Sequence, residues 1–500
     1  MSGEATRPTA SSALVRRLFL RILGLIVVCA FASLWVQVDG LIGSKGIAPA
    51  QELLHIALAR LGPEAYWRVP TLLWIDCSDA TLHFLCALGV VLGLCLALAA
   101  PRPAVLLALV WGLYLSLASV GNVFLGYQWD TLLLETCFFS VGFAASKRPA
   151  SGVAVLLLRW LLFRLLFLSG MVKLLSGDES WRDLSALTYH YWTQPLPTWT
   201  SAYANDLPLS VHHLTCGATL AIELVAPFGV FGPRRARQVS CAAIVLLQLA
   251  IALTGNYGFF NLLTLALCIP LLDDRSLRSV TPPRLRRWLP ARVPAAVAAP
   301  APSARVAAIV AAGFFFAVTA CAGLERLDAA ALVPSAMGEL LSVLSPLRTF
   351  NSYGLFAIMT KERPEILLEG SADGVTWRPY EFRWKPGPPD HRPRFTTPHM
   401  PRLDWQMWFA ALESCAQEAW LHALFVRLLE GDASVDALLA TNPFPEAPPR
   451  YLRSTLWWYQ FSTPADRHRG VWWTRERIGP YCPTVTLEEG RLRVVSDSAP

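Results

Sequence analysis

The sequence is poor in charged residues and very poor in lysine. Asp, Glu, Lys and Arg make up 16% of the 500 residues, whereas a soluble globular domain carries about 25%. Only five of the 43 basic residues are lysines, a skew typical of a GC-rich bacterial genome. Hydrophobic residues reach 54% and lie in long runs, and the mean hydropathy is +0.41. This composition excludes a disordered chain and a simple soluble enzyme, and it predicts an integral membrane protein.

The common motifs of catalysis and of metal or nucleotide binding are missing from the sequence. The eleven cysteines form no CxxC pair, the nine histidines form no HExxH, and no GxSxG, Walker or GxGxxG motif has a suitable context. We therefore expect no metal ion and no cofactor. The net charge of +7 lies in short clusters between apolar runs, which indicates membrane orientation and argues against nucleic-acid binding.

Most of the cysteines lie inside apolar runs, where a thiol behaves as a small hydrophobic group. Cys77, Cys415 and Cys482 are the three that lie clearly in polar segments. The sequence therefore suggests one disulfide, between Cys415 and Cys482. It leaves open the alternative that these two cysteines are reduced and unrelated.

Eight apolar runs have about the length that crosses a bilayer, near 20 residues. They lie at 18–38, 80–99, 104–122, 126–146, 153–174, 212–232, 238–254 and 305–324. A shorter run at 258–272 either crosses the membrane or dips in and returns. We expect a polytopic α-helical membrane protein of about nine spans, with a helical bundle at 18–274 and a last transmembrane helix at 305–324.

The basic clusters set the orientation, because short loops rich in Lys and Arg stay in the cytoplasm. With nine spans, every basic cluster falls on one side. Residues 1–17 and the linker 275–304, a tether without obvious structure, are then cytoplasmic. The loops 39–79 and 175–211, and everything after about residue 325, lie on the other side. The clusters are Arg16/Arg17/Arg21, Arg102, Lys147/Arg148, Arg234/Arg235/Arg237 and the arginines between 275 and 287.

The last third of the chain has the pattern of a folded domain outside the membrane. Nine of the nineteen tryptophans lie there, and about 150 residues can bury an adequate core. We expect an α+β domain over residues 345–500 that faces away from the cytoplasm. Residue patterns predict strands at 353–360, 365–369, 377–384 and 451–461, and helices at 403–416, 419–430 and 433–440.

Six ionisable side chains lie inside the predicted spans, where a charge is costly and needs a partner. They are Asp130, Glu135, Glu223, Arg159, Arg164 and Lys173. At about 1.5 Å per residue, Arg164, Glu135 and Glu223 lie near the midplane, so we expect Arg164 to pair with Glu135 or Glu223. Such pairs most often only fix helix packing. Arg159 is close enough to the cytoplasmic end of its span to extend its guanidinium to that surface.

Lys173 lies near the outer end of its predicted span, just before the polar segment 176–181. It could extend its ammonium group harmlessly to the surface. The alternative is a lysine of lowered pKa in a half-dry pocket, able to act as a base, with His190 or Asp178 nearby in the outer loop. Both interpretations stay open at this point.

Six motifs, in order along the chain, resemble those of the lipase maturation factor family. They are QWDTLLLE at 128–135, FRLLFLSGMVKL at 163–174, LTYHYWTQPLP at 187–197, TGNYGFFN at 254–261, EGSADG at 369–374 and PRLDWQMWFAAL at 401–412. The resemblance covers about residues 14–485. Two positions depart from the family pattern: Trp192 replaces an acidic residue and Cys137 replaces a glycine. The first departure puts in doubt any role that needs a charge in this outer loop.

The resemblance implies a protein of the endoplasmic reticulum membrane that helps newly made lipases reach their active, dimeric state. It also implies that the C-terminal region lies in the lumen and takes part in lipase binding. In a bacterium the equivalent location is the inner membrane with its periplasmic face. The family is not known as an enzyme and offers no established catalytic residues. Residues 163–173 with Trp181 are also similar to a short segment of the vitamin K-dependent carboxylase group, whose lysine acts as a base.

Three functions follow from these patterns. The first is a maturation or folding factor whose partners are the lipid bilayer and client lipases. Its candidate client-binding residues are Arg402, Asp404, Trp405 and Trp408, since Trp and Arg are enriched in binding hot spots, although core packing accounts for about half of such tryptophans. The second is a membrane-embedded enzyme of carboxylase-like type that uses Lys173 as base. The third is a transporter, ranked last because the sequence shows no inverted repeat.

Overall fold

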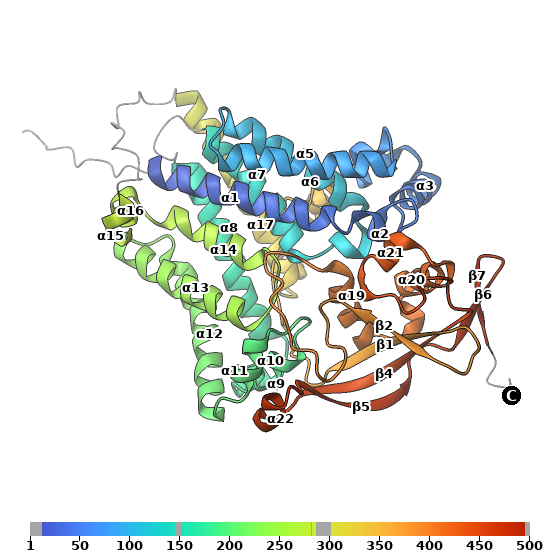
Figure 1. Cartoon of the computed structure of the whole chain (residues 1–500). Coiled ribbons are helices and arrows are strands. Elements are labelled where there is room, and N and C mark those ends of the chain that lie inside the picture. Colours follow the sequence, from blue (N-terminus) through green and yellow to red (C-terminus); the bar gives the residue numbers. More distant parts are fainter. Residues whose placement is uncertain (1–12, 146–151, 282, 287–301, 496–500) are drawn as a thin grey trace, which may run out of the picture.

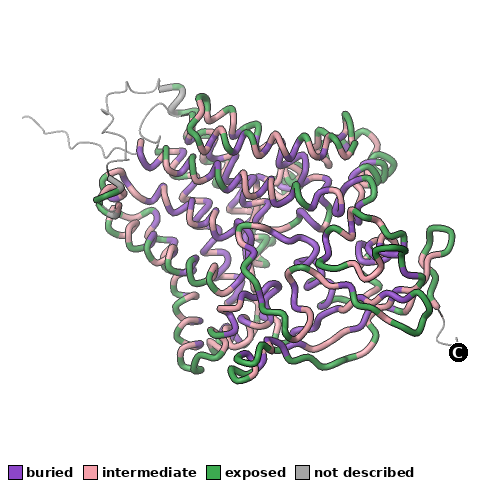
Figure 2. Tube along the Cα trace, in the orientation of Figure 1, coloured by how far each residue is buried: buried purple, intermediate pink, exposed green. Residues whose placement is uncertain are grey.

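The computed structural model describes residues 13–145, 152–281, 283–286 and 302–495. A bundle of helices makes up one side of the molecule, and a sheet with its own helices packs against one end of that bundle (Figure 1). One cluster of buried hydrophobic residues extends from Phe19 in the bundle to Leu452 in the sheet, and the buried residues of the two parts adjoin (Figure 2). The bundle and the sheet domain therefore share a core.

Seven helices in the described residues are long and apolar enough to cross a membrane. They are α1 (Ala13–Trp35), α5 (Asp79–Ala97), α6 (Pro103–Val120), α8 (Gly152–Leu175), α12 (Leu209–Gly229), α13 (Arg234–Thr254) and α17 (Pro302–Arg326). The two other predicted runs are also helical, as α7 (Gln128–Ala145) and the short α14 (Phe260–Cys268) with η4 (Ile269–Leu271). The polytopic helical fold is confirmed, whereas the count of nine spans stays a prediction.

Helices α1 and α5 lie side by side along much of their length (Figure 1). Two glycines make this close approach possible. A Cβ atom on Gly24 would lie 2.5 Å from the backbone nitrogen of Ala97, and one on Gly89 would lie 2.2 Å from the Phe31 ring. Small residues at such contacts let membrane helices gain packing energy where the hydrophobic effect between helices is lost.

The connecting segments contain short helices. These are α2 (Val38–Ile42), α3 (Ala50–Leu61) and α4 (Ala65–Arg68) in the first predicted outer loop, and α9 (Glu179–Arg182), α10 (Ala186–Thr193) and α11 (Trp199–Asn205) in the second. The linker prediction is wrong at its start, which forms α15 (Asp274–Val280) and α16 (Pro283–Arg286). Asp273 caps α15 by accepting the Ser276 N–H at 2.6 Å, which stabilises the first turn. Residues 1–12 and 287–301 lie outside the described residues.

The C-terminal domain is built on an antiparallel seven-stranded sheet, in the order β3-β2-β1-β4-β6-β7 with β5 also paired to β4. The strands are β1 (Pro364–Ser371), β2 (Arg378–Phe382), β3 (Leu439–Thr441), β4 (Tyr451–Phe461), β5 (Trp473–Pro480), β6 (Val485–Glu488) and β7 (Arg491–Val494). Helices α19 (Arg402–Leu412), α20 (Ala419–Glu430) and α21 (Ala433–Asp436) lie between the sheet and the bundle (Figure 1). The predicted α+β class is confirmed, and Cys415 and Cys482 form a disulfide.

Two local predictions in this domain are wrong. Residues 353–360 form no strand, because this segment enters the bundle and bonds to its polar side chains. Residues 433–440 are helical only to Asp436, and β3 begins at Leu439. Strand β5 was missed because its sequence, WTRERIGP, lacks the alternation of apolar and polar residues that predicts a half-buried strand.

Candidate functional site

The acidic residue of α7 that lies nearest the sheet domain, Asp130, is paired with Arg402 of α19. The two terminal nitrogens of Arg402 lie 2.8 and 3.0 Å from the two Asp130 oxygens. Tyr114 donates its hydroxyl to Asp130 at 2.5 Å, and Arg402 donates to the Phe124 carbonyl at 2.5 Å. Both charged side chains are 0% exposed. This bidentate contact joins the bundle to the sheet domain, and such contacts are strong and geometrically specific.

Glu135, further along α7, pairs with Arg164 of α8, one of the two partners predicted for that arginine. The pair also binds the segment that leads to β1. Arg164 donates to the Asn351 carbonyl at 2.6 Å, and Tyr353 donates its hydroxyl to Glu135 at 2.6 Å. This buried pair therefore holds the start of the C-terminal region inside the bundle.

Glu223 of α12 pairs with Lys173 of α8 instead of with Arg164. The Lys173 nitrogen lies 2.9 and 2.8 Å from the two carboxylate oxygens, and it donates to the Ser169 carbonyl at 3.2 Å. Lys173 is 4% exposed, so it does not extend to the surface. Its nitrogen also lies 5.2 Å from the centre of the Trp181 ring, a cation–π contact.

Arg159 and Asp178 have structural contacts away from these pairs. Arg159 is half-buried and donates to the carbonyl of Pro270 at 3.1 Å, in η4 directly after the C-terminal end of α14. Asp178 caps α9 and accepts the Met359 N–H at 2.6 Å. The structure therefore does not bring Asp178 to the Lys173 amine as a catalytic neighbour, but uses it to fix the segment before β1.

The residues predicted to bind a client are buried in the folded protein, which argues against a direct contact between these side chains and a client. Arg402, Asp404, Trp405 and Trp408 are at most 7% exposed. Trp408 donates its indole N–H to the Thr193 carbonyl at 2.8 Å. Asp404 accepts the backbone N–H groups of Trp384 and Lys385 at 2.8 and 2.9 Å, and its burial raises its pKa to about 6. These side chains attach α19 to the rest of the molecule.

Further attachments between the two parts are made by Gln37, Asn256 and Arg363, of which only Asn256 lies in one of the motifs identified in the sequence, TGNYGFFN. Gln37 accepts the Arg402 N–H at 2.9 Å and donates to the Met400 carbonyl at 3.0 Å. Asn256 accepts the Thr396 N–H at 2.7 Å. Arg363 donates to three carbonyls between residues 192 and 195. The sequence feature that could have predicted these contacts is the position of Gln37 and Asn256 at the outer ends of apolar runs.

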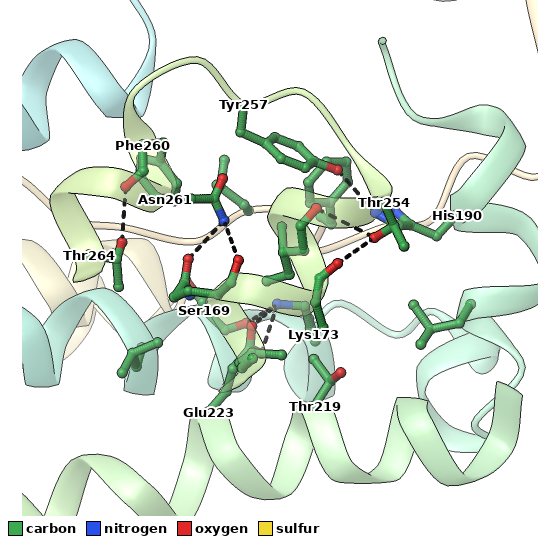
Figure 3. A pocket seen from close by; sticks show the side chains of 18 of the residues that line it. Ser169, Lys173, His190, Thr219, Glu223, Thr254, Tyr257, Phe260, Asn261 and Thr264 are labelled. Carbon is green, nitrogen blue, oxygen red and sulfur yellow. Dashed lines mark hydrogen bonds and ion pairs between the residues drawn. The ribbon is translucent and has the colours of Figure 1, made fainter. Parts of the chain in front are cut away.

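A cavity of about 180 Å³ lies beside the Lys173–Glu223 pair (Figure 3). Its walls come from α8, α12, α13 and α14, and α10 and residues 355–356 contribute at the outer end. Apolar side chains supply most of the surface. The polar groups include the ion pair, His190, Gln248 and Asn261. The structure thus brings Lys173, Glu223 and His190 to one cavity, and leaves Asp130, Glu135 and Arg164 outside it.

The protonation of His190 follows from its hydrogen bonds. Gln194 donates its amide nitrogen to the carbonyls of Tyr191 and Thr254, so its oxygen is the acceptor for the Tyr257 hydroxyl at 2.8 Å. The contact of 3.0 Å between Tyr257 and His190 Nε2 must then be donated by the histidine. Burial lowers the pKa of His190 to about 4, and the charge of Lys173 contributes. His190 is therefore neutral near pH 7, with its Nδ1 lone pair free to accept.

The Gly-Asn-Tyr-Gly segment at 255–258 separates α13 from α14, and protein groups satisfy its polar atoms, which is needed where a helix is interrupted beside a membrane. Asn256 donates its backbone N–H to the Leu196 carbonyl at 3.3 Å, and Gly255 forms an isolated bridge with Pro197. Asn261 donates its side-chain nitrogen to the Gln248 side-chain oxygen at 2.9 Å. The break places Tyr257 and Asn261 at the cavity wall.

This geometry supplies binding groups more readily than a nucleophile. The three N–H bonds of Lys173 match three acceptors, the two oxygens of Glu223 and the Ser169 carbonyl. A lysine that acts as a base needs an unengaged lone pair directed at the substrate. The contacts of Lys173 therefore favour a cavity that binds over one that catalyses.

Comparison with known proteins covers both parts of the chain. Residues 14–279 match the lipase maturation factor transmembrane domain, and residues 349–483 match the lipase maturation factor C-terminal domain. Lipase maturation factor 2 of Rattus norvegicus is 36% identical, over 97% of this chain and 85% of the relative. Lipase maturation factor 1 is 34% identical in Bos taurus, over 96% and 90%, and 33% identical in Homo sapiens, over 96% and 89%. No solved structure matches. The chain belongs to the lipase maturation factor family.

Proposed function

We propose that the protein is a membrane-embedded maturation factor that helps secreted lipases reach their active form. The observation that carries the proposal is the match along nearly the whole chain to proteins named lipase maturation factors. Both domains of the family are matched, so the proposal concerns the bundle and the sheet domain together. Its partners are the bilayer and client lipase chains.

The sheet domain works on the non-cytoplasmic side of the membrane in this proposal. The start of α1 and helices α15 and α16 lie at the end of the bundle opposite the sheet (Figure 1). Arg16, Arg17, Arg275 and Arg278 belong to these elements. Because basic loops are retained in the cytoplasm, this charge asymmetry supports a lumenal or periplasmic sheet domain. The membrane is that of the endoplasmic reticulum, or the inner membrane in a bacterium.

The client contacts the face of the sheet that points away from α19. Ile366 and Leu368 of β1 are completely buried in the shared core, so the alternating residues Leu367 and Glu369 point to the opposite face. On that face the Arg453 guanidinium lies 4.2 Å from the Trp377 ring centre, and Arg475 lies 4.9 Å from that of Trp457. We call Trp377, directly before β2, and the sheet residues Leu367, Glu369, Arg453, Trp457 and Arg475 the outer sheet face.

The outer sheet face suits a partly folded client for two reasons. Trp and Arg are the residues most enriched in binding hot spots, and here they are at least partly exposed, unlike Trp405 and Trp408. The buried pairs that attach the domain to the bundle hold this face in a fixed position. The client is therefore bound by a rigid surface at the membrane.

The test combines a client assay with point variants in the full-length chain. Cells lacking the gene, and expressing Arg453→Ala or Trp457→Ala, should secrete a normal mass of lipase whose activity per milligram falls by on the order of tenfold. Trp67→Ala, an exposed tryptophan of the 39–79 segment, is the matched control and should leave activity unchanged. Normal lipase activity in both outer-face variants would reject the surface. Normal activity without the gene would reject the function.

The location is tested separately in sealed microsomes or, for a bacterium, in sealed inside-out vesicles of the inner membrane, both of which expose the cytosolic face. A protease site is placed in the exposed turn at 372–376, between β1 and β2. Protection in intact vesicles, and cleavage after detergent is added, is the expected result. Cleavage in intact preparations of known cytosolic-side-out orientation contradicts the proposed sidedness.

A further inference from the structure

The cavity beside Lys173 reaches the lipid-facing side of the bundle. Thr219 of α12 and Ala250 of α13 line it from two neighbouring helices, and Ala250 is also exposed. Leu249 and Leu253, next along α13, are 48% and 58% exposed, as expected for side chains in contact with lipid tails. Because Ala250 both lines the cavity and is exposed, a ligand would enter from the bilayer beside α12 and α13.

The charges in the cavity select against a charged ligand. Lys173 and Glu223 neutralise each other, and the lysine N–H bonds match acceptors that the protein already provides. A phosphate or carboxylate entering this space would bring an uncompensated charge into a low-dielectric interior, at a cost of several kcal/mol. The matching ligand is uncharged.

The unused hydrogen-bonding groups select for a polar ligand. Within the part of the chain that the structure describes, no protein partner is recorded for three atoms at the cavity. These are Gln248 Nε2, a donor, and Asn261 Oδ1 and His190 Nδ1, two acceptors, as assigned from the bonds that the other atoms of these side chains make. Hydroxyl groups pair with the two acceptors, and an ester or hydroxyl oxygen pairs with the donor.

The size of the cavity completes the description. A cavity of roughly 150 Å³ accepts a benzene molecule, so about 180 Å³ holds the polar end of a lipid but not its chains. The chains would pass between α12 and α13 into the bilayer, beside the exposed leucines. We propose that this cavity binds the glycerol end of an uncharged partial acylglycerol, a mono- or diacylglycerol, taken from the outer half of the membrane.

The experiment uses the full-length chain in nanodiscs and a diacylglycerol with a photoactivatable diazirine on one acyl chain. Label should appear in peptides of α12 and α13. Unlabelled diacylglycerol should compete at least about tenfold better than phosphatidic acid with the same chains, because tenfold corresponds to only 1.4 kcal/mol of the charge penalty, and hexadecane should not compete. Equal competition by phosphatidic acid or hexadecane overturns the proposal, as does label absent from both helices.

Matched tryptophan variants localise the site. Thr219→Trp fills the cavity wall and should lower the labelling of α13 by about tenfold. Val225→Trp adds the same group on the same helix, at a residue that is 69% exposed and does not line the cavity, and should label normally. Ala250→Trp is the second blocking variant if Thr219→Trp does not fold. Normal labelling of a folded blocking variant refutes the assignment.

This inference does not rest on the proposed function. Its readout is covalent labelling, whereas the maturation proposal is read from lipase activity. If the chain is labelled as expected but matures no lipase, the maturation proposal fails and the cavity proposal stands. If the chain matures lipase but is not labelled specifically, the cavity proposal fails and the maturation proposal stands.

Discussion

The contact between Asp130 and Arg402 allows a quantitative test of how the sheet domain is attached. Both side chains are fully buried, and one lies in the bundle and the other in α19. Asp130→Asn leaves the Arg402 charge without its counter-ion, and Arg402→Met leaves Asp130 in the same condition. Removing one partner of a buried pair costs about 3–5 kcal/mol. Expressed as an opening equilibrium for the interface, this is about 150-fold to 5,000-fold.

Hydrogen exchange of the α19 amides measures this opening directly, since protection there reports separation of the interface. Both single variants should exchange faster by that factor. The double variant Asp130→Leu/Arg402→Met leaves no buried charge unpaired, although Tyr114 loses its acceptor. The free energy that it removes from the closed interface should therefore be smaller than the sum for the two single variants by about 2 kcal/mol.

A surface pair within the same domain serves as the control. Arg453 and Glu369 lie 2.8 Å apart and are 33% and 21% exposed, so Glu369→Gln should cost less than about 1 kcal/mol and leave α19 exchange nearly unchanged. If Asp130→Asn exchanges like the wild type, or if the double variant loses as much as both singles together, the pair does not hold the interface.

Three further predictions use other buried groups. Glu135→Gln strands Arg164 and weakens the Tyr353 bond, and should raise exchange of the segment 349–356 by a factor comparable to that of Asp130→Asn, with α20 unaffected. Cys415→Ser opens a disulfide that spans 67 residues and should lower the free energy of unfolding of the sheet domain by about 2–5 kcal/mol; an unchanged melting temperature contradicts this. The third concerns pH. Because burial lowers the pKa of His190 to about 4, the unfolded chain binds a proton below about pH 6.5 while the folded chain does not, so His190 by itself lowers stability between about pH 6.5 and pH 4, by at most about 3 kcal/mol. His399, whose pKa burial also lowers to about 4, acts in the same direction, whereas the raised pKa of Asp404 acts in the opposite direction in this range. Stability should therefore fall less, or rise more, towards about pH 4 in His190→Phe than in the wild type; identical slopes in the two proteins refute the assignment.

The sequence was sufficient for the features that depend on local pattern. Apolar runs near 20 residues predicted the membrane helices, and β1, β2, β4, α19 and α20 lie close to where periodicity placed them. The expected depth of residues along α7 and α8 was enough to select Glu135 as one of two possible partners for Arg164. Depth can be predicted because a helix that crosses a membrane rises by a constant distance per residue.

Long-range contacts could not be read from the sequence. Trp405 and Trp408 are of a residue type that is common in binding surfaces. Whether they are exposed or buried depends on which face of α19 the bundle covers, and this is set by the docking of the whole domain. The pairing of Asp130 with Arg402 joins residues 272 positions apart, and no local signal specifies it. The segment 353–360 has a strand-like composition, but side chains of α7, α9 and α17, and the Asp178 cap of α9, provide its hydrogen-bond partners.

The three acidic residues of the bundle divide into two roles once their partners are known. Asp130 and Glu135 both bind groups of the C-terminal region, whereas Glu223 binds Lys173 and lines the cavity. The bundle therefore cannot be treated as an anchor from which the sheet domain is removed without consequence. Deleting residues 345–500 would take away Arg402, Asn351 and Tyr353 together and leave Asp130 as a buried, unpaired charge. Loss of lipase maturation in such a truncation would reflect a damaged bundle as much as a missing client surface, so only substitutions on the outer sheet face, which leave the buried pairs intact, can locate where the client binds.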